Sequence, residues 1–176
     1  MKIADSLIIP APRQEVWDFL VDFERSALCM PGVVALKVNE DDSFRGTVEV
    51  RVGPIAARFS GDGRIEERTV PDRFRASASG RDQFTGTSVQ IDFDSRLIEV
   101  AEETRIDYEM ELQLRGKLAQ FGQGIVKATA TQMTQEFVAN ITRELTGEES
   151  VTGKQRSAGR IVFDSIRGRG EPSEKS

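Results

Sequence analysis

The stretch Ile106–Arg115, IDYEMELQLR, runs directly into Gly116–Leu145, GKLAQFGQGIVKATATQMTQEFVANITREL, and the two together decide the fold. In the first segment apolar and polar residues alternate strictly, which is typical of a strand with one buried and one solvated face. In the second segment we expect a long helix over Lys117–Leu145, because its apolar residues recur at helical spacing: Leu118, Phe121, Ile125, Met133, Phe137, Ile141 and Leu145. Such a helix spans roughly 40 Å, enough to cross a whole sheet.

Four earlier segments show the same period of two between turn residues, and we expect strands over residues 44–52, 57–65, 73–80 and 89–94. Ile3–Ile9 is expected to form a first strand, and a helix is expected to open at Ala11 and Pro12. A second short helix, Phe23–Met30, ends where proline and glycine stop it. This order predicts an α+β fold in which a curved antiparallel sheet grips the long C-terminal helix.

Length and composition bound the class of protein. The 176 residues predict one domain over residues 1–146 and a polar tail over residues 147–176. A net charge of −5 argues against a nucleic-acid binder, and no apolar run is long enough to cross a bilayer. With one cysteine and no signal peptide, we expect a cytoplasmic protein. The absence of histidine removes the usual general base, the commonest zinc ligand and every Ser-His or Cys-His pair.

The tail contains a short apolar segment, RIVFDSIRGR, in which arginines flank the apolar side chains of Ile161, Val162, Phe163 and Ile166. Basic residues around an apolar patch favour contact with an anionic membrane surface or a partner protein. The segment is short and Asp164 interrupts it, so a polar tail without such a role is an equal interpretation.

The single cysteine lies in ALCMPGV, Ala27–Val33. Without a histidine partner and beside an apolar methionine, Cys29 is expected to be a packing residue rather than a nucleophile. The stretch ends the second helix and turns the chain into the sheet. In helix-grip folds that corner lies by the cavity entrance, so we expect an entrance or partner contact here from Leu28, Cys29, Met30, Pro31 and Gly32.

Small residues occupy several inward positions where a filled core would hold Val, Ile or Leu: Gly46, Gly61, Gly63, Ala76, Ala78, Gly80 and Gly86. Either the glycines bend the sheet or admit the helix closely, or they leave an apolar cavity. A cavity would be walled by Phe59, Phe74, Phe84, Phe93, Tyr108, Met110, Phe121 and Ile125. Its candidate hydrogen-bonding groups are Tyr108, Thr129 and, if a bulge turns it inward, Ser88. The paired acids of the last strands fall on the solvated face, and Gly53–Gly63 lacks a phosphate-binding spacing.

Several motifs together resemble the CoxG family, the G subunits of carbon monoxide dehydrogenase, within the START-like, SRPBCC helix-grip superfamily, which shares its fold with Bet v 1. The resemblance covers residues 1–145 and rests on Cys29–Gly32, Val52–Pro54 and Phe121–Gly124. It implies a non-catalytic accessory protein for a molybdenum hydroxylase of the carbon monoxide dehydrogenase type. It further implies a hydrophobic ligand such as menaquinone, and recruitment of the enzyme to the inner face of the cell membrane. In family members membrane attachment is ascribed to a C-terminal extension, which is short in this sequence.

Two alternatives stay open. On the same fold an enzyme of the cyclase or hydrolase type would use polar residues inside the cavity, and the expected inward face offers only Tyr108, Thr129, Ser88 and Cys29. The domain could also serve purely as an assembly factor for the molybdenum enzyme. The sequence does not name the ligand, the partner's substrate or the oligomeric state.

Overall fold

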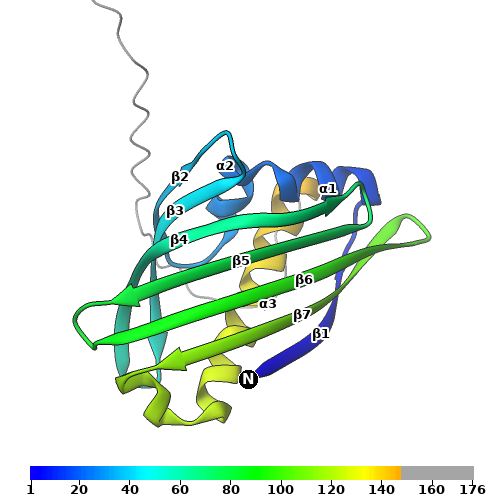
Figure 1. The fold of residues 1–176 in the computed structure, drawn as a ribbon. Coiled ribbons are helices and arrows are strands. Elements are labelled where there is room, and N and C mark those ends of the chain that lie inside the picture. Colours follow the sequence, from blue (N-terminus) through cyan, green and yellow to red (C-terminus); the bar gives the residue numbers. More distant parts are fainter. Residues whose placement is uncertain (148–176) are drawn as a thin grey trace, which may run out of the picture.

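The computed structural model describes residues 1–147, and they form one antiparallel sheet that wraps around a long helix (Figure 1). The sheet has seven strands in the order β1-β7-β6-β5-β4-β3-β2. Consecutive strands from β2 to β7 are neighbours, and β1 closes the far side against β7. The strands are β1 (Lys2–Ile9), β2 (Val33–Val38), β3 (Ser43–Val52), β4 (Ile55–Thr69), β5 (Arg73–Asp82), β6 (Thr87–Val100) and β7 (Glu103–Arg115).

The helices lie at two places in the chain. Between the first two strands come α1 (Arg13–Val21), α2 (Phe23–Ser26) and the short 3-10 helix η1 (Ala27–Cys29). After the last strand come the 3-10 helix η2 (Lys117–Phe121) and α3 (Gln123–Thr146), which crosses behind the sheet in Figure 1. The predicted helix-grip fold is therefore confirmed.

Two details differ from the sequence-based expectation. The long helix does not begin at Lys117, because Gly122 has a φ of +82° and separates η2 from α3. Strand β2 was not expected, because the run VVALKV does not alternate and a register shift lies between Val33 and Ala35.

The inner face of the sheet carries two separate apolar clusters. One joins α1 and the C-terminal half of α3 to the sheet, with Trp17, Leu97 and Ile141 among its buried residues. The other lies under η2 and the start of α3, with Leu112 and Leu118 at its centre. α3 therefore packs against an apolar cluster at each end. The residues that face the middle of α3 belong to neither cluster.

Within residues 1–147, no helix has the length and apolar character needed to span a membrane. The expected tail contact through Ile161, Val162, Phe163 and Ile166 lies outside the described residues.

Candidate functional site

The middle of the inner face is the candidate site. Ala76 and Phe93, paired across β5 and β6, belong to neither apolar cluster, and neither do Ala130 and Met133 of α3. These side chains are only half-buried, although the sheet register and the helical spacing direct them inward. The closest approaches of α3 to the sheet are at β1 and β3, on its two sides, rather than at β5 and β6. The helix thus bridges a stretch of sheet that carries small side chains.

Two glycines of the inner face are required by close contacts with neighbouring residues. A Cβ on Gly61 would overlap the backbone of Ser79, and one on Gly63 would overlap the ring of Phe44. These two glycines let β4 and β5 approach closely and let an aromatic ring lie on the sheet. Gly86 lies in the β5–β6 turn at φ +66° and is not an inward position. The inward side chains of β5 in this stretch, Ala76 and Ala78, are small without being glycines.

Most of the predicted wall residues lie around this stretch. Phe93 and Tyr108 stack with their ring centroids 5.8 Å apart. Phe59, Met110 and Phe121 pack on the cluster beside η2. Phe74 packs on the opposite cluster, with its ring centroid 6.0 Å from that of Phe23.

Two predicted wall residues lie elsewhere. Phe84 is 94% exposed in the turn between β5 and β6, because the strand ends at Asp82 and the alternation no longer applies. Its assignment to the wall was wrong. Ile125 is 42% exposed in the first turn of α3, close to Gly53 of the β3–β4 turn, so it borders the end of the helix.

Tyr108 is the polar group best placed for a ligand. It is 3% exposed, its pKa is raised by burial, and Thr134 of α3 lies close enough to its hydroxyl to oppose that rise. Asp5, its partner across β1 and β7, adds a negative charge that also raises the pKa of Tyr108. Asp5 was not among the expected polar groups; it lies on the same face of β1 as Ile3 and Leu7, but it is exposed.

The other two expected polar groups are less suited. The hydroxyl of Thr129 donates to the carbonyl oxygen of Ile125 at 2.9 Å. Ser88 pairs with Arg81 and Arg115 in an unbroken register, so it faces outward. The bulge that would have turned Ser88 inward is absent from the described β6.

The Cys29–Gly32 corner is held by the core. Cys29 is 3% exposed, and burial raises the pKa of its thiol to about 11. Its carbonyl oxygen accepts a hydrogen bond from the Asn140 side chain at 2.8 Å, which ties η1 to α3. Because the thiol is buried, Cys29 is not an entrance contact, whereas Leu28 is 49% exposed. Met30 and Pro31 are half-buried, and Gly32 is in the turn at φ +83°.

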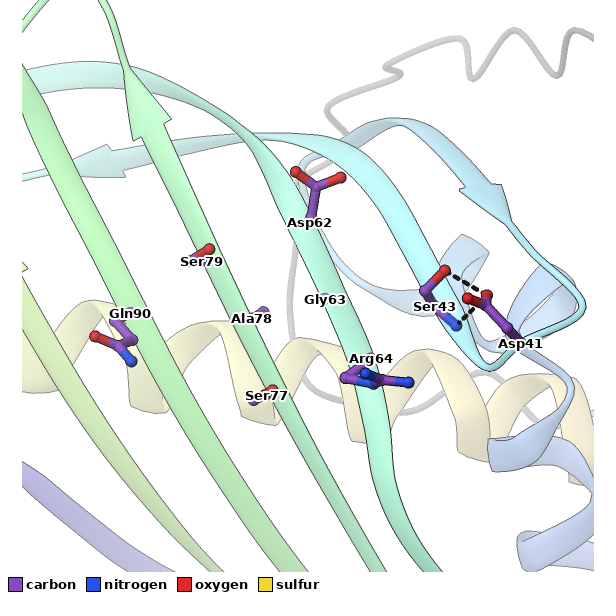
Figure 2. Close-up of a pocket in the computed structure, with 9 residues that line it drawn as sticks. All are labelled: Asp41, Ser43, Asp62, Gly63, Arg64, Ser77, Ala78, Ser79 and Gln90. Atoms are coloured by element: carbon purple, nitrogen blue, oxygen red, sulfur yellow. Dashed lines mark hydrogen bonds between the residues drawn. The ribbon is translucent and has the colours of Figure 1, made fainter.

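The outer face of the sheet is polar. It carries an open hollow of about 310 Å³, lined among others by Asp62, Ser79 and Gln90. Figure 2 shows these residues on the strands, with α3 on the far side of the sheet. Many carboxylates of the outer face form ion pairs with arginines, such as Asp94 with Arg73 at 2.6 Å and Asp62 with Arg45 at 2.7 Å. In residues 1–147, no group of Cys, Asp and Glu is arranged to hold a metal ion. These acids therefore lie on the solvated outer face of the sheet, as expected.

Comparison with known families gives one match, to the model described as the G subunit of carbon monoxide dehydrogenase (CoxG), over residues 6–146. Among curated protein sequences, no relative matches the chain.

Solved structures share the fold at low identity. A conserved protein from Geobacillus kaustophilus superimposes with a TM-score of 0.78 at 18% identity, covering 84% of this chain and 96% of that one. A START superfamily protein from Mycobacterium smegmatis gives 0.61 at 9% identity, covering 83% and 97%. The Zhui aromatase/cyclase from Streptomyces sp. R1128 gives 0.60 at 12% identity, covering 82% and 93%. At these identities the likeness concerns the fold alone.

Proposed function

We propose, from the premise that this chain belongs to the CoxG family of carbon monoxide dehydrogenase G subunits, that it is a non-catalytic accessory protein with a hydrophobic ligand beneath α3. The ligand we propose is a quinone of the menaquinone type. The partner is a molybdenum hydroxylase of the carbon monoxide dehydrogenase type, which the protein couples to the membrane.

One observation carries the ligand proposal. α3 contacts the sheet mainly at β1 and β3, and between them the sheet carries the small Ala76 and Ala78 while Phe93 and Met133 stay half-buried, which supports a space beneath the helix. Pockets of this type bury a ligand between apolar walls and orient it through a few polar groups. Tyr108 supplies such a group, because its buried phenol carries a proton at neutral pH and can donate a hydrogen bond to a quinone carbonyl.

The test is binding of a short-chain menaquinone analogue to the purified full chain. Native mass spectrometry should give a one-to-one complex. A ligand that binds only the folded state stabilises it, so the melting temperature should rise with the concentration of the analogue. At an analogue concentration a hundred times its Kd, the free energy of unfolding should increase by about 2.7 kcal/mol. Absence of both effects, together with a tightly filled interior, would contradict the proposal.

An enzyme on the same fold has one observation in its favour: Asp5, the partner of Tyr108 across β1 and β7, adds a negative charge that raises the pKa of the Tyr108 hydroxyl. The two roles differ in what happens to the ligand. A binding protein returns the quinone analogue unchanged after long incubation, whereas an enzyme converts it, and chromatography of the extracted ligand separates these outcomes.

A further inference from the structure

The turn between β5 and β6 presents one aromatic side chain on a rigid support. Phe84 is 94% exposed, whereas Asp82 at the base of the turn is 3% exposed. The Asp82 carboxylate accepts hydrogen bonds from the backbone N–H groups of Phe84 and Thr85, at 3.2 and 3.1 Å, and from the Thr85 hydroxyl. The Thr85 hydroxyl also bonds to that of Thr87, which in turn accepts the N–H of Leu118. These hydrogen bonds hold the turn against the end of the sheet, so the backbone at Phe84 is already ordered in the unbound protein.

Two exposed arginines lie next to this turn. Arg81 and Arg115 are exposed and flank Ser88 across β5, β6 and β7, at one end of a polar hollow of about 440 Å³. Within residues 1–147 neither arginine takes part in an ion pair, and the hollow's own acid, Asp62, is paired with Arg45. The two guanidinium groups are thus left without an acidic partner among residues 1–147 and can pair with carboxylates of another molecule.

We infer that Arg81, Phe84, Ser88 and Arg115, here called the basic tip, form the docking surface for a protein whose apolar pocket is rimmed by carboxylates. Phe84 would fill the pocket while the two guanidinium groups pair with the rim. A preformed aromatic anchor loses little conformational freedom on binding, which is why such residues carry much of the energy of protein interfaces. The inference rests on the proposed function for the partner's identity, the molybdenum hydroxylase.

An anionic membrane fits the tip less well than a protein pocket. Interfacial anchoring needs several large apolar side chains in one plane, and the tip offers one, Phe84.

The experiment measures binding of the full chain to the intact hydroxylase of the same organism by surface plasmon resonance. Phe84→Ala is expected to weaken binding roughly tenfold or more. The double change Arg81→Glu and Arg115→Glu is expected to slow association and to reduce its dependence on salt. Val100→Ala, at another exposed apolar residue by the opposite β6–β7 turn, and Lys37→Glu, on the β2 edge, are the matched controls and should bind as the unaltered chain does.

The possible outcomes distinguish the proposed partnership with the hydroxylase from the proposed docking surface. If the unaltered chain does not bind the hydroxylase, both the proposed partnership and this docking surface are overturned. Binding that is insensitive to Phe84 and to both arginines overturns only the docking surface. Phe84-dependent binding to phosphatidylserine vesicles, with no dependence on Phe84 at the hydroxylase, assigns the tip to a membrane and likewise overturns the inference.

Discussion

Glu49 donates its backbone N–H to the carbonyl oxygen of Gly32 at 2.7 Å, which fixes the Pro31–Gly32 turn against the middle of β3. The approach is so close that a Cβ on Gly32 would overlap the carbonyl oxygen of Glu49. The glycine of this motif therefore serves the passage from η1 into the sheet.

Gly32→Ala should destabilise the fold by about 3 kcal/mol, because alanine is strained at φ +83° and the turn must also move away from β3. Urea unfolding followed by circular dichroism measures the change. The matched control is Gly124→Ala, in the first turn of α3, where a Cβ meets nothing within 4 Å. There alanine should stabilise the helix by up to about 1 kcal/mol. Equal effects at the two positions would refute the role given to Gly32.

Cys29 should be chemically inert in the folded protein, because burial raises the pKa of its thiol from 9.0 to about 11. Ellman's reagent at pH 8 should therefore react at the rate at which the protein opens, and at full speed in denaturant. Rapid labelling of the native protein would show that the thiol is accessible and would restore its candidacy as an entrance residue.

The same thiol gives a pH dependence of stability. The raised folded-state pKa means that its stabilising contribution is fully present below pH 9 and is lost as the pH rises toward 11. Cys29→Ala should cost about 1 kcal/mol near neutral pH through lost packing. Between pH 9 and 11 the difference from the unaltered chain should shrink, which denaturant titrations at several pH values would reveal. A difference that grows with pH would contradict the sign argued here.

The strands and the long helix were predictable because each repeats its period many times, as in Ile106–Arg115 and Gln123–Leu145. Helical spacing continues through Phe121 and Ile125, so the apolar pattern placed Gly122 inside the helix, although glycine is unfavourable there. The position of Cys29 depends on Asn140, 111 residues away in the chain, and no local pattern encodes such a contact. The outward position of Phe84 depends on where β5 stops, and strand ends are the least determined by alternation.

Ala76→Leu tests the space beneath α3. If the middle of the inner face is open, the larger side chain should change stability by less than about 1 kcal/mol and should weaken binding of the quinone analogue at least tenfold or so. The control is Ala57→Leu, since Ala57 faces the same way but is 4% exposed within a packed cluster. Overpacking there should cost about 1–3 kcal/mol. If Ala76→Leu is as destabilising as Ala57→Leu, the interior is full and the ligand site is elsewhere.

Tyr108→Phe tests whether the ligand's polar group is bound by β7 on the inner face of the sheet. The phenylalanine keeps the stacking with Phe93 and removes the hydroxyl together with its interaction with Thr134, so the free energy of unfolding should fall by about 1 kcal/mol. Loss of one hydrogen bond to a quinone carbonyl should weaken binding by about 1 kcal/mol, or roughly fivefold, measured by isothermal titration calorimetry. Thr129→Val is the comparison, because its hydroxyl is already bonded to Ile125 and should contribute nothing to the ligand. A larger loss for Thr129→Val than for Tyr108→Phe would move the polar end of the ligand to the helix side and leave Tyr108 as a packing residue.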